Sequence, residues 1–398
     1  MKRVFDIAVI IVALLTPLIV SAEESGKGDV SVKEKVGNSG VFEDILAHPL
    51  QNNLWILKTD SLGDTLFTKT YGEDSEYRPY ALDLTDGGGF TVAGREFPHP
   101  GRAKNFFLRF DSLGDTLWSY SAEFGEVERI HKTPDGDYIV LGMQIFGYDS
   151  LPSEAFKIDS LGDTLWTGEL AGAKIFGDVG STKTFDGGII MIKTGPKKMF
   201  LSDVSNCLVK TDSLGDALWV RTFGRFTIIE LNCVEQTRDS GFIMTGLKGG
   251  KLWLLKTDSK GRIQWRRRYG EGKWINEGFQ VMEIGEGNYL VAGRLSGVFS
   301  LFSVNAKGRI VWQKEYSSWF HYMERTSDDC FVMTGTKNED LWLLKVDMDG
   351  SVLWEKSYGN QYYDTGKKVK ETSDEGYLIL GVKDTRDWKP GHNYGETK

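Results

Sequence analysis

The chain has 398 residues, of which 40% are hydrophobic and 26% charged, and its formal net charge is -8. With 47 glycines and nine prolines, this composition excludes a disordered tail or a collagen and indicates a folded chain rich in turns. The acidic balance argues against a general binder of nucleic acid, because affinity for phosphates comes mainly from clustered Lys and Arg. Three cysteines are too few for a disulfide framework or a four-thiolate zinc site.

The first 22 residues have the pattern of an export signal. Lys2 and Arg3 are followed by an almost unbroken apolar run over residues 7–20, and Ala22 ends a stretch of small residues. The alternative is an uncleaved membrane anchor, but a stable span needs about 20 apolar residues. We therefore expect a secreted or periplasmic protein with no membrane contact after cleavage. Residues 23–51 are polar and are expected to form a spacer.

A repeated segment dominates the rest of the chain. The pattern first seen in residues 58–67 recurs six times, which makes seven copies, and the 287 residues from Asp60 to Asp347 cover six steps of about 48 residues each. In each copy a Gly follows the turn acid, or its Asn stand-in, after three residues, and a large aromatic residue follows the Gly after four more. These aromatic residues are Phe67, Trp118, Trp166, Trp219, Trp265, Trp312 and Trp354. A period of this length is typical of a propeller blade.

A second signature alternates with the first, also seven times. An acidic turn leads into an apolar run that begins with Phe90, Tyr138, Ile189, Phe242, Tyr289, Phe331 or Tyr377. Each repeat then holds four short runs rich in β-branched and aromatic residues, joined by Asp/Gly turns. The sequence therefore predicts an all-β fold, a seven-bladed β-propeller with four antiparallel strands per blade.

The order of the runs predicts how the ring closes. The repeats start with an outer hairpin at residues 54–71 and end with an inner hairpin at residues 369–382, so the two together would complete one blade. We expect this two-plus-two closure, a propeller over residues 52–382 and a tail over residues 383–398. Residues 32–46 faintly resemble an inner hairpin, and a strand pair there would change the closure.

The turn of Asp, Gly and Trp, as in Asp258, Gly261 and Trp265, resembles the tryptophan-docking (PQQ-like) repeat of quinoprotein-type propellers. The whole repeat resembles tandem propeller repeats of secreted bacterial proteins of unassigned function. The resemblance covers residues 54–382 and implies that each Trp docks onto the neighbouring blade. The quinoprotein motif has one more residue between Asp and Gly, and quinone-dependent enzymes have eight blades and adjacent cysteines. The resemblance therefore implies the fold and no redox chemistry.

Several features that resemble sites have a structural explanation. The Asp-rich turns lack the bidentate Glu of a calcium loop, and the five histidines show no ligand spacing, so we expect no metal and no cofactor. A basic residue two positions before the turn acid recurs in six repeats, as in Lys58 and Lys256, which favours either a structural ion pair or an apolar stem that carries its charge to the solvent. The triplet at residues 266–268 could bind phosphate, but its expected place on an outer strand favours protection of the sheet edge. Cys207 and Cys233 could pair or stay free.

Function is expected at the end of the ring where the connections vary, because the repeating strands are committed to packing. Aromatic residues are frequent there and suit a protein or a polysaccharide ligand. The candidate ligand-binding residues are Tyr77, Tyr80, Trp274, Trp319, Phe320, Tyr362 and Tyr363. We expect a monomeric, non-catalytic binding or scaffold propeller. The alternative is a glycan-active, endoglucanase-like hydrolase that uses a carboxylate pair among Glu277, Glu324 and Asp364.

Overall fold

The computed structural model describes residues 52–72, 75–98, 103–122, 126–133, 135–143, 155–159, 161–168, 180–194, 206–213, 215–223, 229–271, 275–360 and 362–384. All of them belong to the second of two compact units, Leu50–Lys398. The predicted signal and spacer, the strand pair considered at residues 32–46, and residues 385–398 lie outside the described residues.

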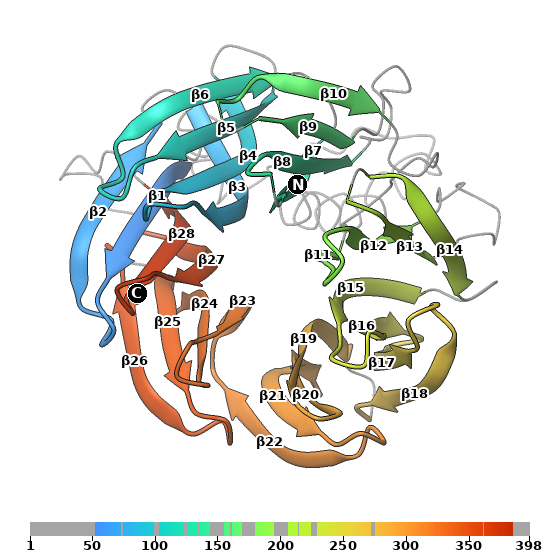
Figure 1. Ribbon diagram of the computed structural model, residues 1–398. Helices are drawn as coiled ribbons and strands as arrows, with labels where there is room; N and C mark the ends of the chain where they lie inside the picture. Colours follow the sequence, from blue (N-terminus) through green and yellow to red (C-terminus); the bar gives the residue numbers. More distant parts are fainter. Residues whose placement is uncertain are drawn as a thin grey trace, which may run out of the picture. The chain divides into compact units, whose positions relative to one another are not determined.

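The described chain forms seven antiparallel sheets of four strands, arranged around an axis as the blades of a propeller (Figure 1). Blade 1 consists of β3 (Ser75–Leu84), β4 (Phe90–Pro98), β5 (Lys104–Phe110) and β6 (Thr116–Ala122). Blade 2 consists of β7 (Glu126–Lys132), β8 (Tyr138–Met143), β9 (Ala155–Ile158) and β10 (Thr164–Gly168). Blade 3 consists of β11 (Ser181–Lys183), β12 (Ile189–Thr194), β13 (Asn206–Thr211) and β14 (Ala217–Phe223).

The second half of the ring repeats this order. Blade 4 consists of β15 (Ile229–Gln236), β16 (Phe242–Lys248), β17 (Lys251–Thr257) and β18 (Ile263–Tyr269). Blade 5 consists of β19 (Glu277–Gly285), β20 (Asn288–Leu295), β21 (Val298–Val304) and β22 (Ile310–Tyr316). Blade 6 consists of β23 (Trp319–Arg325), β24 (Phe331–Lys337), β25 (Asp340–Val346) and β26 (Val352–Tyr358).

The closing blade joins the two ends of the repeats. Its strands, from the inside outwards, are β27 (Thr365–Glu371), β28 (Tyr377–Asp384), β1 (Asn52–Thr59) and β2 (Thr65–Tyr71). Strand β1 pairs with β28 in an antiparallel register from Asn52 opposite Asp384 to Thr59 opposite Tyr377. The predicted seven-bladed propeller with a two-plus-two closure is therefore confirmed.

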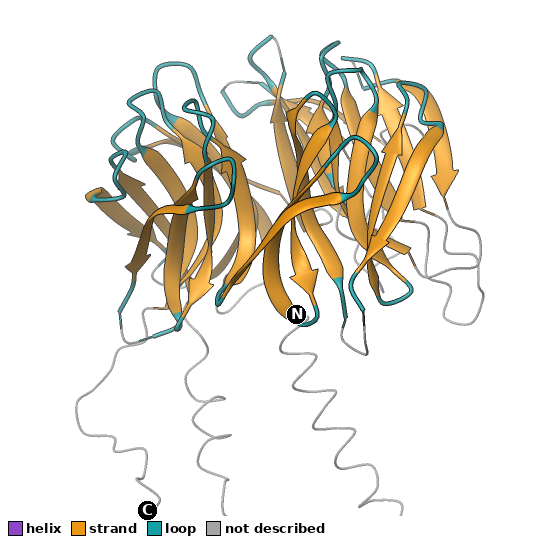
Figure 2. Cartoon of the chain, turned by 90° about the horizontal axis from the view of Figure 1, so that it is seen from below, coloured by secondary structure: helices purple, strands orange, loops and turns teal. Residues whose placement is uncertain are grey.

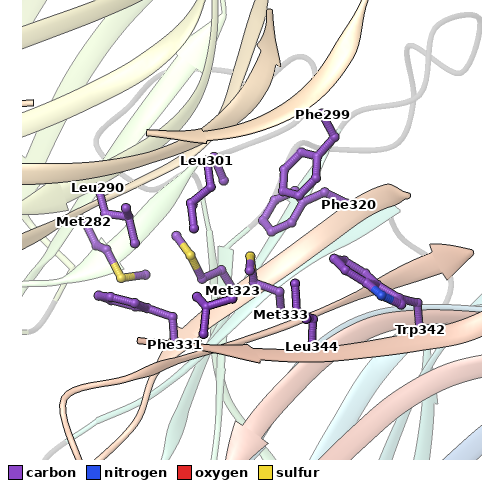
Figure 3. Close-up of a cluster of buried hydrophobic side chains, with 12 residues drawn as sticks. Met282, Leu290, Phe299, Leu301, Phe320, Met323, Phe331, Met333, Trp342 and Leu344 are labelled. Carbon is purple, nitrogen blue, oxygen red and sulfur yellow. The ribbon is translucent and has the colours of Figure 1, made fainter. Parts of the chain in front are cut away.

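Burial explains the composition of the strands. Every residue of β17 after Lys251 is buried, because both faces of this middle strand pack against neighbouring blades. The outer strand β18 is mostly exposed. Apolar clusters fill the spaces between blades, and the one between blades 5 and 6 includes Met282, Leu301 and Phe331 (Figure 3).

Each outer aromatic residue whose side chain is described contacts the turn glycine of the next blade. The Cζ3 atom of Trp265 lies 3.1 Å from the position that a Cβ would take on Gly308, and Tyr269 Oη donates to the Gly308 carbonyl at 2.8 Å. The same pairing joins Trp118 to Gly162, Trp219 to Gly261, Trp312 to Gly350, Trp354 to Gly63, and Phe67 to Gly114. The side chain of Trp166 lies outside the described part of the chain. These contacts fix neighbouring blades relative to one another.

Five of the six recurring basic residues form an ion pair inside their own blade, as predicted, whereas Arg109 donates to the hydroxyl of Tyr138 in blade 2 at 2.7 Å. Lys256 is 2% exposed, and its Nζ atom lies 2.8 Å from Asp239 Oδ2 and donates to the Thr257 carbonyl. The same pair recurs between Lys58 and Asp374, Lys157 and Asp135, Lys210 and Asp186, and Lys345 and Asp328. The lysine thus links the third strand of a blade to the turn between its first two strands.

The connections gather at two ends of the ring, above and below the strands (Figure 2). One end, here called the turn end, holds the short Asp/Gly turns such as Thr85–Gly89 and Asp60–Asp64. The other, here called the variable end, holds the links between blades and the turns between the second and third strands of a blade.

Candidate functional site

A groove of about 380 Å³ opens at the variable end between blades 5 and 6. It is lined by Phe279, Arg294, Gly297, Val298, Phe299, Tyr316, Ser317, Ser318, Trp319, Phe320, Thr336, Lys337 and Asn338. Only two residues, Ser317 and Ser318, connect β22 to β23. The groove therefore combines aromatic rings with short polar side chains and two cations.

The neighbouring links show why the groove opens here. Before β27, Asp364 accepts hydrogen bonds from the backbone N–H groups of Asn360 and Asp384, at 2.9 and 3.0 Å. Its own backbone N–H donates to the Glu339 carbonyl of blade 6 at 2.6 Å. These hydrogen bonds hold the link before β27 in place across the contact between blade 6 and the closing blade.

Asn276 occupies the same position before β19. Its Oδ1 atom accepts from the Ser296 N–H at 2.7 Å, and its own N–H donates to the Gly250 carbonyl of blade 4. The side chains of Asn276 and Asp364 are both buried. Asn276 and Asp364 therefore have the same structural role in two blades, which is to hold the link between neighbouring blades in place by hydrogen bonds.

Ser318 takes the position of Asn276 and Asp364 in the link before β23. Its side chain is too short to make the hydrogen bonds that those two residues make. Its backbone N–H donates to the Tyr316 carbonyl at the end of β22, whereas the N–H groups of Asn276 and Asp364 donate to the turn between the second and third strands of the preceding blade. Its Oγ atom is buried and has no hydrogen-bond partner among the described residues. A buried hydroxyl without a partner is costly, and a ligand in the groove can satisfy it.

Arg294 and Trp319 form the wall of the groove. The guanidinium carbon of Arg294 lies 4.7 Å from the centre of the Trp319 ring and 5.9 Å from that of Phe279. Trp319 keeps 51% of its surface exposed. Cation–π contact of this kind holds an exposed indole in place, so a binding partner meets a ring that is already ordered.

The floor of the groove is apolar. Phe320 is 8% exposed and stacks on Phe299, with ring centres 5.0 Å apart, and on Phe279 at 6.1 Å. Figure 3 shows Phe299 and Phe320 facing one another beside the apolar cluster of Met323 and Met333. This packing ties the floor to the core, so the groove is built on rigid strands.

The structure brings some of the predicted ligand-binding residues together. Trp319 and Phe320 line the groove, and the hydroxyl of Tyr363 lies 3.4 Å from Thr336 Oγ1 at its edge. Tyr362 lies in the same link as Tyr363, and its backbone N–H donates to Asn360 Oδ1. Trp274 lies outside the described residues.

Four of these residues were expected in connections and lie in innermost strands instead. Tyr77 and Tyr80 belong to β3, and Trp319 and Phe320 begin β23. The inner strands start earlier than the sequence pattern indicates, because they contain a bulge, for example at Tyr80 and at His321. Tyr77 packs edge-on against Phe106 at 5.1 Å, and burial together with Glu96 raises its pKa to about 12.

The three candidate catalytic carboxylates are dispersed. Glu277 in blade 5 accepts from Asn232 Nδ2 at 2.9 Å, whereas Asp364 belongs to the closing blade, with blade 6 between them. Glu324 lies five residues into β23, so it is about 16 Å along the strand from the variable end. Both of its carboxylate oxygens accept from Lys370 at 2.9 Å. The chain thus shows no facing acid pair among these residues.

Sequence reasoning missed a set of ionisable groups on the inner strands. Lys183 of blade 3 lies 3.3 Å from Asp83 of blade 1, which shows that side chains from non-adjacent blades meet near the ring axis. Burial raises the pKa of Glu235 to about 8; a bond from the Glu283 backbone opposes this shift, and the carboxylates of Glu283 and Glu324 add to it. The inner strands of different blades thus bring these groups together near the ring axis.

The described residues contain no disulfide bond. All three cysteines are free, and Cys207 and Cys233 lie on β13 and β15 of different blades. Within the described ranges, no group of three His, Cys, Asp or Glu side chains is placed to hold a metal ion. The described residues also contain no helix long and apolar enough to cross a membrane.

Comparison with known proteins supports the architecture. No protein-family model and no curated protein matches the chain. Among solved structures, a catalytically inactive virginiamycin B lyase from Staphylococcus aureus with quinupristin has a TM-score of 0.53 at 10% identity, over 82% of this chain and 99% of that chain. The Dos1 propeller has a TM-score of 0.54 at 8% identity, over 84% and 93% of the two chains.

The WD40 β-propeller domain of Doa1 has a TM-score of 0.52 at 9% identity, over 83% of this chain and 96% of that chain. The fold is a β-propeller. Identities this low show the fold alone.

Proposed function

We propose that this protein is a non-catalytic, extracytoplasmic binding propeller that holds a segment of polysaccharide in the groove between blades 5 and 6. The observation on which this proposal rests is the unpartnered Ser318 hydroxyl beside the ordered indole of Trp319. An aromatic face with nearby hydrogen-bonding groups matches a sugar ring, which has an apolar face and a rim of hydroxyls.

A glycan fits the groove better than a folded protein does. Ser317, Ser318 and Asn338 supply short polar groups around one exposed ring. A stable protein interface buries about 800 Å² on each partner, around a larger aromatic centre. A groove of about 380 Å³ instead has the size of a site for a small ligand or a short oligomer.

Binding without chemistry is supported by what the carboxylates do. Asp364 fastens a link, as Asn276 does without a charge, and Glu324 pairs with Lys370. Glycoside hydrolysis needs two acids about 5–10 Å apart on either side of the scissile bond. The extracytoplasmic setting is part of the proposal and is supported by the signal-like pattern of residues 1–22.

The test is retention of the purified protein on immobilised β-glucans and other neutral polysaccharides, with new reducing ends assayed in parallel. Trp319→Ala should reduce retention at least tenfold. Leu353→Ala is the matched control, because Leu353 on the outer strand β26 is also 51% exposed, and it should change nothing.

Three outcomes would contradict the proposal. Equal retention of both variants would exclude the groove, and no retention on any polysaccharide would exclude a glycan ligand. Reducing ends that appear with the native protein and vanish in Glu277→Gln would show a hydrolase.

A further inference from the structure

A second cavity, of about 310 Å³, lies on the outer side of blade 4, away from the groove. Its lining consists of Lys248, Trp253, Arg266, Arg267 and Arg268. The Nζ atom of Lys248 lies 4.7 Å from the centre of the Trp253 ring. Four cations around one indole are unusual on a chain with a net charge of -8.

The internal repeats provide a comparison. In blade 6, Lys337 and Trp342 take the places of Lys248 and Trp253, and Glu355 takes the place of Arg266, since it pairs with Leu344 as Arg266 pairs with Leu255. Glu355 accepts from Lys337 Nζ at 2.6 Å and from the indole N–H of Trp342 at 2.5 Å. This carboxylate neutralises the lysine and satisfies the indole.

The closing blade has a neutral version of the same arrangement. Lys383 lies over Trp55 at 4.9 Å, and the Trp55 indole N–H donates to the hydroxyl of Thr68. The position therefore holds an acceptor in both of these blades. In blade 4 it holds a cation, so the acceptor is missing and the charge is reversed.

The cavity of blade 4 therefore has several side-chain hydrogen-bond donors and no side-chain acceptor at the position of Glu355. The described residues give Lys248, Arg266 and Arg268 no carboxylate partner and give the indole N–H of Trp253 no hydrogen-bond acceptor. Burial lowers the pKa of Lys248, and the charges of Arg268 and Arg266 lower it further. Protection of a sheet edge does not require this cluster, since the outer strands β22 and β26 mix acids with bases.

Geometry selects the side chains that act together. Arg266 and Arg268 alternate along β18 and so share one face, the face of Trp253. Arg267 also belongs to the lining, but its side chain leaves β18 on the other face, where its Cγ atom lies 2.6 Å from the position of a Cβ on Gly308. The side chains of Lys248, Trp253, Arg266 and Arg268 thus line the same cavity from one face of the blade.

We infer that this cavity binds a tetrahedral oxyanion, a sulfate or phosphate group carried by a larger molecule. Guanidinium groups pair with such oxygens in a bidentate manner, and an indole N–H is a donor only. The anion would occupy the place that the Glu355 carboxylate takes in blade 6. This site is independent of the groove between blades 5 and 6.

The test uses dextran sulfate as the probe, neutral dextran as the blank, and inorganic sulfate and inorganic phosphate as competitors. Arg266→Glu recreates the acceptor of blade 6, so the variant should fold and melt like the native protein. We expect it to lose at least tenfold in affinity for dextran sulfate. Arg309→Glu makes the same charge change at an exposed turn of blade 5 and should stay within twofold.

The competitors distinguish the two kinds of ligand. If inorganic sulfate competes better than inorganic phosphate, the site prefers a sulfate ester, and the opposite order indicates a phosphate ester. Trp319→Ala should bind dextran sulfate like the native protein, which separates this inference from the proposed function. The inference of an oxyanion site would be overturned if the native protein, Arg266→Glu and Arg309→Glu bound dextran sulfate with equal affinity. It would also be overturned if both arginine variants lost affinity equally.

Discussion

The Cζ3 atom of Trp265 in blade 4 lies 3.1 Å from the position that a Cβ would occupy on Gly308 in blade 5. Gly308 has a φ of +69°, so the same residue supplies the left-handed turn and the space for the indole. The turn between the outer strands is therefore also the contact between blades.

Replacement of Trp265 by Ala should destabilise the protein by about 2–4 kcal/mol, because a half-buried aromatic ring at a blade contact is lost. Val311, 63% exposed on the outer strand β22, is the control, and Val311→Ala should change stability by less than about 0.5 kcal/mol. Urea denaturation gives both values. Equal midpoints for the two variants would contradict the docking role.

Two glycine variants separate the energy of the Trp265 contact from the strain of a left-handed backbone. Gly308 and Gly87 both have positive φ, but a Cβ on Gly87 meets nothing within 4 Å, whereas one on Gly308 meets Arg267 and Trp265. Gly87→Ala should cost about 1 kcal/mol, the strain of the left-handed conformation alone. Gly308→Ala should cost at least about 1 kcal/mol more, measured by the same denaturation, and an equal cost would show that the turn is not a docking surface.

The closure of the ring predicts the effect of truncation. A chain that ends at Lys370 lacks β28, so β1 loses its pairing with that strand along its whole length, from Asn52 to Thr59, and becomes an open edge. We expect aggregation or loss of cooperative melting, checked by light scattering and calorimetry. A chain that ends at Arg386 keeps β28 and should melt like the full protein. A monomeric, cooperative protein ending at Lys370 would contradict this closure.

Much of this fold could be predicted from the sequence, because each repeat encodes the same strands and turns. The spacing of Gly261 and Trp265 indicates a turn and an outer strand, and the order of hairpins indicates the closing blade. Propeller blades interact mainly with their neighbours, so a local pattern determines a long-range arrangement.

The site was less predictable, because it depends on departures from the repeat. Ser318 is informative only beside Asn276 and Asp364, whose task the structure reveals. Arg266 is informative only beside Glu355 and Thr68, which requires the register of the outer strands. Bulges in the inner strands also moved Trp319 from an expected connection to the start of β23.

The raised pKa of Glu235, about 8 in the folded protein, predicts a pH dependence of stability. Between about pH 4.5 and 8 the unfolded chain ionises this group while the folded protein keeps it protonated, so the unfolded state binds fewer protons and stability falls as pH rises. Glu235→Gln should remove this contribution. The free energy of unfolding of the variant, relative to native, should rise by at least about 1 kcal/mol from pH 5 to pH 8.5. A constant difference across that range would show that Glu235 is ionised in the fold.

If the groove between blades 5 and 6 is the ligand site, its residues determine the affinity for the retained polysaccharide. Isothermal titration with a soluble oligosaccharide of that polymer gives Kd for the native protein, Trp319→Ala and Leu353→Ala. We predict a Kd at least tenfold higher for Trp319→Ala and an unchanged Kd for Leu353→Ala. The same Kd for all three proteins would contradict the claim.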